Sequence, residues 1–312
     1  MLHPAARHLL PVLACAPLLS ISPASADQLL YRNGDFITEV GTGFEGADIS
    51  RAQTTVITFS ISNTTGTGVP TRVIDDFAVP VGAEWKLSKL RFYATQSQAS
   101  GTESTTFAFP SAVARVTWGD PRSDIPWSIV GGDFVANRLL PSSAFANAYR
   151  VSASGAATGR TRPIFAVDVN LSDLPPISGI SSGAPFFIEY AAVGEPGRSG
   201  LASTFPLTPL PANPNGSQFF AGAYQTLPNQ LLEAPFEIWG TARCGRSDVA
   251  GANQAVGFDG VLTADDIIVF LGWYFASDTR ADVGGSNQST TPDALLTADD
   301  IIVFLGRFFA GC

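Results

Sequence analysis

Histidine, methionine and lysine are scarce in this 312-residue sequence, which has two histidines, one methionine and two lysines. Both histidines, His3 and His8, fall within residues 1–26. That segment has a basic start, a short apolar stretch and an Ala24-Ser25-Ala26 ending, which together predict a secretory signal peptide. A retained membrane anchor is the alternative reading of the same residues. Removal of a signal peptide leaves no histidine, and this excludes Ser-His-Asp and Cys-His catalysis and histidine-ligated metal sites.

Long apolar runs and basic clusters are also missing. No other segment reaches a transmembrane length without charges or helix breakers, so we expect an exported protein with no integral membrane segment. The absence of a basic cluster argues against nucleic acid as a partner. The negative charge is concentrated at the C-terminal end, where residues 244–312 carry nine acidic and three basic residues. This excess suits a cation-binding segment.

Residues 27–243 have the composition of an all-β region. Short runs rich in β-branched and aromatic residues alternate with Gly, Pro, Asn and Ser, as in TTVITFSIS at 54–62 and AVARVTW at 112–118. Several runs alternate apolar and polar residues, which is typical of half-buried strands. We therefore predict one β-sandwich or jelly-roll domain over residues 27–243, with the proline-rich stretch 207–215 as a loop within it.

A duplication occupies the C-terminal segment. The string LTADDIIVFL occurs at 262–271 and again at 296–305, and Asp248, Asn253 and Asp259 recur 34 residues later as Asp282, Asn287 and Asp293. Two helices are expected, over 264–275 and 298–309. The segment should therefore form a small all-α module of two loop–helix repeats.

Each repeat matches the second half of an EF-hand-type calcium loop. In the first copy Asp259 fits position 5, the Val261 carbonyl position 7, Thr263 position 9 and Asp266 position 12. Asp248 and Asn253 are the nearest upstream oxygen donors, and their use requires an expanded loop. The corresponding residues of the second copy are Asp282, Asn287, Asp293, Leu295, Thr297 and Asp300. The sequence thus predicts two calcium sites, one per repeat.

Helix capping is the competing explanation for part of this pattern. Thr263 and Asp266 form a capping box, and acidic residues favour the positive end of the helix dipole. Capping does not require Asp248, Asn253 and Asp259 to recur in the second copy. Both readings remain open at this stage.

Two cysteines bracket the duplicated segment. In an exported protein Cys244 and Cys312 are expected to form a disulfide, and the alternative is a pair of free thiols. On the chain-entropy model such a loop closure stabilises by about 4 kcal/mol.

The tandem LTADDIIVFLG copies and the terminal Gly311-Cys312 resemble dockerin domains, and in particular the dockerin-like C-termini of exported planctomycete-type bacterial proteins. The resemblance covers residues 244–312. It implies calcium-dependent folding and docking onto a cohesin-like or cell-surface partner. It also implies that the partner contacts the start of each helix, at Ala264 and Asp265 in one copy and Ala298 and Asp299 in the other.

The β-region presents no motif of comparable specificity. Glycan binding is one hypothesis, with Trp127 as the best candidate for an exposed sugar platform, whereas Trp118 and Trp239 fit strand patterns and are expected in the core. A glycoside hydrolase or lyase would need two carboxylates in defined positions. Its candidates are Asp75, Asp76, Asp133, Glu189 and Glu237. We expect Asp75-Asp76 to shape a loop or bind a structural cation. The default is a non-enzymatic structural role.

Overall fold

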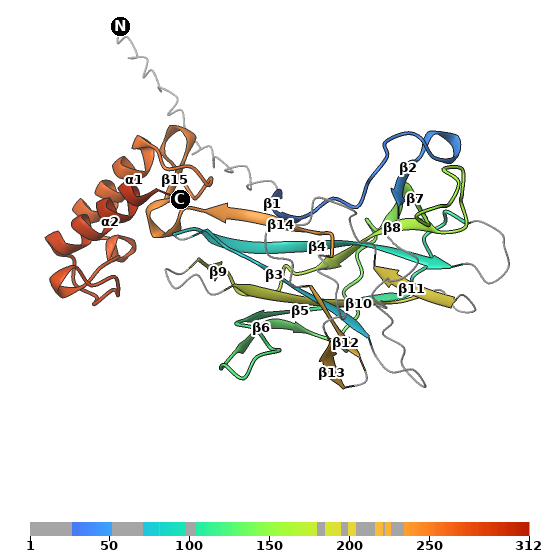
Figure 1. Ribbon diagram of the computed structural model, residues 1–312. Coiled ribbons are helices and arrows are strands. Elements are labelled where there is room, and N and C mark those ends of the chain that lie inside the picture. The colour runs from blue at the N-terminus through green and yellow to red at the C-terminus, as the bar shows by residue number, and fades with distance from the viewer. Residues whose placement is uncertain are drawn as a thin grey trace, which may run out of the picture.

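The computed structural model describes residues 27–51, 71–80, 82–97, 104–179, 185–194, 199–203, 216–220, 222–225 and 234–311. The predicted signal peptide, the 54–62 strand, the 207–215 loop and Cys312 lie outside these ranges. Within them the protein is mainly β, as the sequence predicts, and two α-helices follow the last long strand (Figure 1).

The first sheet has the strand order β1-β14-β4-β8-β7-β2, and β9 and β11 also pair with β4. Its longest strand is β4, which has 14 residues. Different parts of β4 pair with β8, β9, β11 and β14. The strands are β1 (Gln28–Asn33), β2 (Asp48–Arg51), β4 (Glu84–Ser97), β7 (Ala144–Val151), β8 (Pro163–Asn170), β9 (Ile177–Ser178), β11 (Ser199–Ser203) and β14 (Phe236–Arg243).

The second sheet has the order β13-β12-β3-β10-β5-β6. Its strands are β3 (Arg72–Phe77), β5 (Ser111–Trp118), β6 (Ser128–Asp133), β10 (Phe186–Val193), β12 (Ser217–Phe220) and β13 (Ala223–Gln225). All of the pairings given for the described strands are antiparallel except that of β2 with β7.

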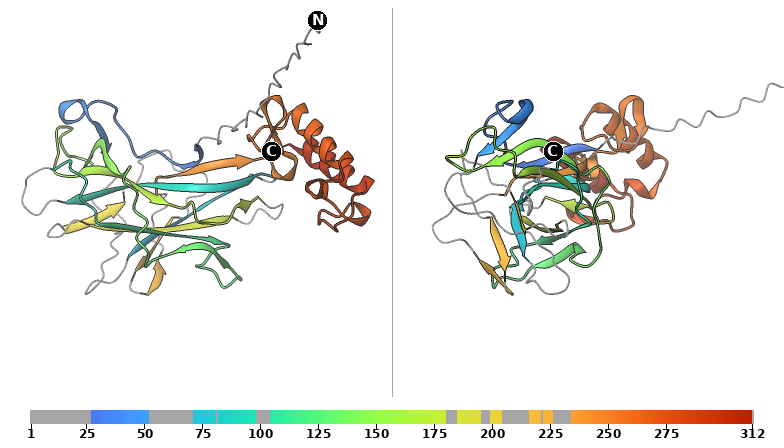
Figure 2. Two further views of the ribbon diagram at one scale, coloured as in Figure 1. Left: turned by 180° about the vertical axis from the view of Figure 1, so that it is seen from behind. Right: turned by 90° about the vertical axis from the view of Figure 1, so that its right-hand side faces the viewer.

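Both sheets contribute to one apolar core. On β10 the side chains of Phe186, Ile188 and Tyr190 belong to this core, so Glu189 between them points to the opposite face of the sheet. Phe92 from β4 stacks on Tyr190 with ring centroids 4.5 Å apart, which joins the two sheets. Figure 2 shows the strands of both sheets in two further views.

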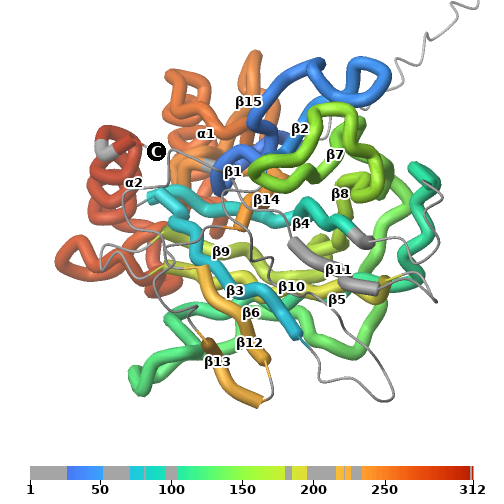
Figure 3. Tube along the Cα trace, turned by 45° about the vertical axis from the view of Figure 1, so that its right-hand side comes forward, coloured from blue at the N-terminus to red at the C-terminus, as the bar shows by residue number. Residues whose placement is uncertain are grey.

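The C-terminal helices are α1 (Ala264–Phe275) and α2 (Ala298–Ala310), so the predicted positions are correct to within one residue. A short hairpin of β15 (Ala250–Gly251) and β16 (Ala255–Val256) precedes α1. The helices share a small core, in which the rings of Phe270 and Phe304 stack at 3.9 Å. Figures 1 and 3 show both helices beside the end of β14. Among the described residues, no helix has the length and hydropathy needed to cross a membrane.

Candidate functional site: the duplicated loop–helix units

Each helix begins with the same capping box. The Thr263 hydroxyl accepts the Asp265 N–H at 3.2 Å, and Asp266 Oδ2 accepts the Thr263 N–H at 2.8 Å. Thr297 and Asp300 repeat the arrangement at the same distances. Thr and Asp at this spacing therefore fix where each helix starts, as the capping interpretation requires.

The capping aspartates also reach back to the beginning of each loop. Asp266 Oδ1 accepts the N–H groups of Val249 and Ala250 at 2.7 and 2.9 Å. Asp300 Oδ1 accepts those of Val283 and Gly284 at 3.0 and 2.9 Å. Both carboxylates are buried. They join residues sixteen and seventeen positions apart, which a capping box alone does not do.

A second aspartate closes each expanded loop. Asp248 accepts the Asp259 N–H through Oδ1 at 3.1 Å and the Gly260 N–H through Oδ2 at 2.9 Å. Asp282 accepts the N–H groups of Asp293 and Ala294 at 3.3 and 2.8 Å. The intervening residues form an insertion, so Asp248 and Asp282 lie next to Asp259 and Asp293 despite the unusual spacing.

Asp259 and Asp293 themselves bind the residue that follows the turn. Asp259 Oδ1 accepts the Val261 N–H at 3.0 Å, and Asp293 Oδ1 accepts the Leu295 N–H at 3.1 Å. The turn needs a positive φ, which is +82° at Gly260 and +64° at Ala294. Alanine at this position is strained, because residues other than Gly, Asn and Asp rarely adopt the left-handed conformation.

Asn253 and Asn287 occupy the tips of the inserted turns and are exposed. Their φ values are 61° and 59°, and the glutamine after each is also left-handed. Asparagine tolerates this conformation better than most residues. The turn therefore accounts for the recurrence of Asn at this position without a bound cation.

The carboxylates concentrate negative charge in the first repeat. Burial raises the pKa of Asp248, its three backbone N–H partners lower it, and the charge of nearby Asp266 raises it further. In the part of the chain that the structure describes, neither aspartate forms an ion pair with a basic residue. Across the described ranges, no group of three or more His, Cys, Asp and Glu side chains is arranged to hold a metal ion.

The predicted partner-binding residues lie at the helix starts. Ala264 and Ala298 are exposed, and Asp265 and Asp299 are half-buried. The sequence interpretation missed a second exposed set, which consists of large apolar residues at matched positions of the two repeats. These are Val261, Ile268 and Phe275 in the first copy and Leu295, Ile302 and Phe309 in the second. Their seven-residue spacing, which the repeated sequence already contains, was the available signal.

Cys244 is disulfide-bonded. Cys312, its predicted partner, lies outside the described residues. The residue before it, Gly311, returns to the start of the module. Gly82 lies next to both Gly311 and Gly245. A Cβ added to Gly82 would lie 3.5 Å from the Gly311 carbonyl oxygen, and a Cβ added to Gly245 would lie 2.8 Å from the Gly82 carbonyl oxygen. The two ends of the module therefore meet at one place.

In the β-region the predicted carboxylates do not form a pair. Glu189 is on β10 in the second sheet and is held by arginines, whereas Glu237 is on β14 in the first sheet and binds Arg32, Tyr93 and the Trp239 indole. The pKa of Asp133 is lowered by the N–H groups of Ala136 and Val135. A lowered pKa at Asp133 does not suit a general acid.

Two expectations for the β-region are wrong, namely the loop-shaping role of Asp75 and the core position of Trp239. Asp75 does not shape a loop, because it is fully buried within β3 and accepts hydrogen bonds from the Asn33 amide and the Ala234 N–H. Trp239 is not in the core, because Ile238 beside it on β14 faces the core and successive side chains of a strand alternate between faces. The Trp239 ring is partly exposed and lies 4.7 Å from Lys89 Nζ. Trp118 does pack against the core. Trp127 is 38% exposed.

No protein-family model matches this chain, and a search of curated proteins found no similar sequence.

Proposed function

We propose that this is an exported, non-enzymatic protein in which a dockerin-like module, residues 244–312, tethers a β-sandwich domain, residues 27–243. The module binds two calcium ions, one per repeat, and docks onto a cohesin-like or cell-surface protein. The observation that carries the proposal is the carboxylate network, which recurs with the same donors and acceptors in both copies.

The charge of this network supports calcium as the cofactor. Asp248 and Asp266 are both buried and close enough for the charge of one to raise the pKa of the other. Each carboxylate oxygen has more than one lone pair, so accepting a backbone N–H leaves capacity for a cation. A hard divalent cation with oxygen ligands would neutralise charge that is costly to bury. The residues that would hold it are Asp248, Asp259 and Asp266, and Asp282, Asp293 and Asp300 in the second copy. Their carboxylates would have to turn toward the ion, because they do not form a metal-binding group in the described structure.

Calorimetric titration of the full chain with calcium tests this part of the proposal. We expect two binding events and a higher melting temperature with calcium, because a ligand that binds only the folded state stabilises it. Asp248→Asn and Asp282→Asn should each remove one event. Asp124→Asn, at an exposed carboxylate of the β-region, is the matched control. No heat and an unchanged melting temperature would refute calcium binding and leave only capped helices.

The exposed apolar positions support docking. Ile268 and Ile302 are 48% and 46% exposed, and Phe275 and Phe309 are 78% and 76% exposed. Residues at a seven-residue spacing lie on one side of a helix, so each copy presents a similar apolar stripe that runs along its helix to the C-terminal end. Exposed apolar patches of this kind are typical of protein interfaces. The partner is therefore expected to present an apolar surface that fits either copy.

Binding of the labelled full chain to the surface of the producing cells tests the docking. If either stripe suffices, Ile268→Asp alone and Ile302→Asp alone should each retain binding, and the double variant should lose it. The double variant Asp124→Asn with Val135→Asp, at exposed sites of the β-region, controls for changes in charge and surface. Full binding by the double stripe variant, with its helices intact, would contradict docking through these faces.

A further inference from the structure

Aromatic rings and guanidinium groups alternate across the outer face of the second sheet. The order is Trp127, Arg115, Phe134, Arg72 and Phe219. The Arg115 guanidinium lies 5.6 Å from the Trp127 ring centroid and 4.6 Å from that of Phe134. The Arg72 guanidinium lies 3.9 Å from both the Phe134 and Phe219 centroids. We call this set the ladder; it draws residues from β3, β5 and β12 and from both ends of β6.

Glu189 anchors the ladder from beneath. Its Oε2 accepts Arg72 Nε at 3.3 Å and its Oε1 accepts Arg115 Nε at 3.1 Å. Glu189 and Arg115 are also direct cross-strand neighbours of β10 and β5. Burial, followed by the Glu189 charge, raises the pKa of Tyr224 at the rim of the ladder to about 12, so this hydroxyl stays protonated. The carboxylate thus fixes both guanidinium planes by their inner edges.

Among the residues that the structure describes, none accepts a hydrogen bond from the outer edge of Arg72. The residue is only 9% exposed, yet its two terminal nitrogens make no hydrogen bond within the described ranges. These nitrogens are not sealed from solvent, because neither of them is a fully buried atom without a hydrogen-bond partner. A charged donor that has lost most of its water and gained no partner is costly. Such a group is best satisfied by an oxygen ligand that arrives from outside.

The charge of the ladder favours an anionic ligand. Two guanidinium groups face one carboxylate, which leaves a local excess of one positive charge in a chain of net charge −9. The neighbouring Arg122 is already neutralised by Asp120, with contacts of 2.7 and 2.8 Å. Asp133 is turned into its own loop, where it accepts the N–H groups of Val135 and Ala136. A planar guanidinium edge matches a carboxylate in geometry as well as in charge.

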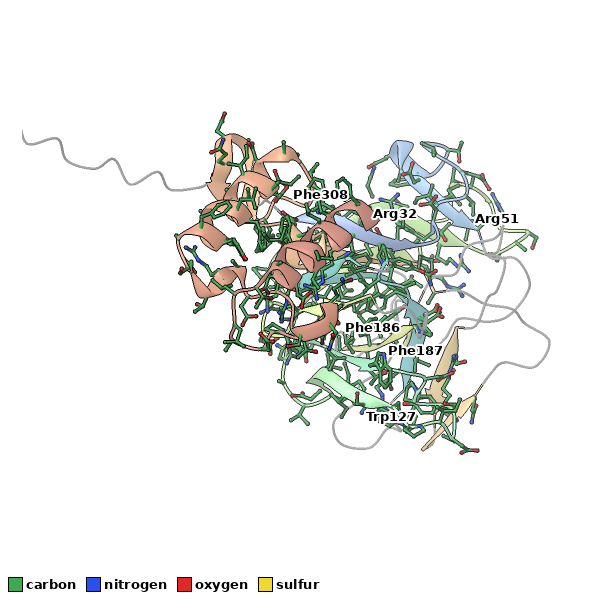
Figure 4. All side chains as sticks on the ribbon, turned by 90° about the vertical axis from the view of Figure 1, so that its left-hand side faces the viewer. Arg32, Arg51, Trp127, Phe186, Phe187 and Phe308 are labelled. Carbon is green, nitrogen blue, oxygen red and sulfur yellow. The ribbon has the colours of Figure 1, made fainter. Side chains whose placement is uncertain are left out.

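Trp127 adds a flat apolar surface at the end of the ladder. Arg115 lies near the indole ring of Trp127. The Trp127 backbone packs against Gly119, where an added Cβ would lie 3.2 Å from Trp127 Cβ. The ring nevertheless remains 38% exposed, and Ile125 and Ile129 beside it are 72% and 55% exposed. Figure 4 shows Trp127 well separated from Phe308 of the helical module. An apolar ring next to donor edges suits a sugar, which has both an apolar C–H face and polar edges.

We propose that the ladder binds an acidic polysaccharide, in which Trp127 stacks on a sugar ring and the outer edge of Arg72 binds the carboxylate of a uronate residue. This inference goes beyond docking and does not depend on it. It gives the β-region a ligand class, whereas the helical module supplies attachment to a protein.

Titration of the full chain with polygalacturonate and with highly methyl-esterified pectin tests the assignment, because esterification removes the carboxylate charge and keeps the sugar. We expect binding to polygalacturonate that weakens with salt, and at least about tenfold weaker binding to the esterified polymer. Trp127→Ala and Arg72→Lys should each weaken polygalacturonate binding about tenfold or more. Phe258→Ala, at an aromatic residue of the helical module with a similar exposure to that of Trp127, should leave it unchanged.

Several outcomes would overturn the inference. These are the absence of polygalacturonate binding, equal binding to both polymers, and full binding by both ladder variants. Trp127 is exposed, so its variant is expected to fold even if a change at the buried Arg72 does not. A melting temperature close to that of the parent chain identifies the variants that can be compared.

Discussion

The two copies of the loop–helix repeat have the same internal network in different surroundings. The first copy adjoins β14: the Cys244 N–H donates to Asp248, and Gly260 is so close to the Ala242 carbonyl that an added Cβ would lie 3.0 Å from it. In the second copy Asp282 is half-buried and Ala294 is exposed. The hydrogen bonds are therefore a property of the repeat itself, while the contact with the β-region determines how deeply each copy is buried.

Removal of a capping aspartate should have the largest effect on this comparison. Asp266→Ala or Asp300→Ala leaves three buried or half-buried backbone N–H groups without an acceptor, which we expect to cost about 3 kcal/mol. Hydrogen exchange of the α1 and α2 amides measures the loss separately from the β-region, because a chain with two regions need not unfold in one step.

Equal losses in the two variants would establish that the copies are energetically equivalent. The matched controls are Asp265→Ala and Asp299→Ala, whose half-buried side chains make none of these loop contacts. A loss below about 1 kcal/mol in both aspartate variants would show that the network contributes little to stability.

Exchange of the turn residue should have the next largest effect, and the sign should differ between the copies. Gly260→Ala places a Cβ at φ +82° and against the Ala242 carbonyl, so we expect a loss of about 1–2 kcal/mol. Ala294→Gly relieves strain at φ +64° and should stabilise by up to about 1 kcal/mol. Thermal melting of each variant measures both, and a stabilising Gly260→Ala would contradict the assigned backbone strain.

The pH dependence of the first copy should be smaller but distinctive. Because burial raises the folded-state pKa of Asp248, the folded module binds that proton more tightly than the unfolded chain does. Its contribution to stability therefore falls as pH rises through the raised pKa, and it is most unfavourable near neutrality.

The difference in melting temperature between the parent chain and Asp248→Asn, followed from pH 4 to pH 7 without calcium, isolates this contribution. We expect the melting temperature of Asp248→Asn to rise relative to that of the parent chain as pH rises. Calcium should abolish the trend, because a bound cation favours the charged carboxylate. A trend of the opposite sign would mean that the backbone N–H groups outweigh burial.

The smallest effect on stability should come from the exposed stripes. Ile268→Ala and Ile302→Ala truncate side chains that are about half exposed, so each should change the free energy of unfolding by less than about 0.5 kcal/mol. Hydrogen exchange of α1 and α2 checks this. A cost above about 1.5 kcal/mol in either variant would show that the stripe is part of the module's own packing.

The repeat was predictable because its interactions are local and occur twice. Thr263 and Asp266 fix the start of α1 within one turn of chain, and the 34-residue period identifies their counterparts. The strand interiors could also be predicted, since the β5, β8 and β10 segments carry strong β-propensity.

The arrangement of the strands could not be predicted in this way. Strands β12 and β13 are short and contain polar residues. They pair with each other, and β12 also pairs with β3, whose residues are more than a hundred positions away in the sequence. The ladder depends on that pairing, because Arg72 and Phe219 meet only when β3 and β12 are neighbours. Asp75 was misplaced for the same reason: its partners come from segments distant in sequence.

The stacked rings of Phe270 and Phe304 occupy the same position in the two copies of the repeat. Each copy thus supplies one half of a shared core, and neither half is complete without the other. A chain that kept only one copy would expose its phenylalanine to water. During gene duplication and recombination, the unit that can be gained or lost without harm is therefore the pair of repeats, and substitutions at this position in one copy constrain those in the other.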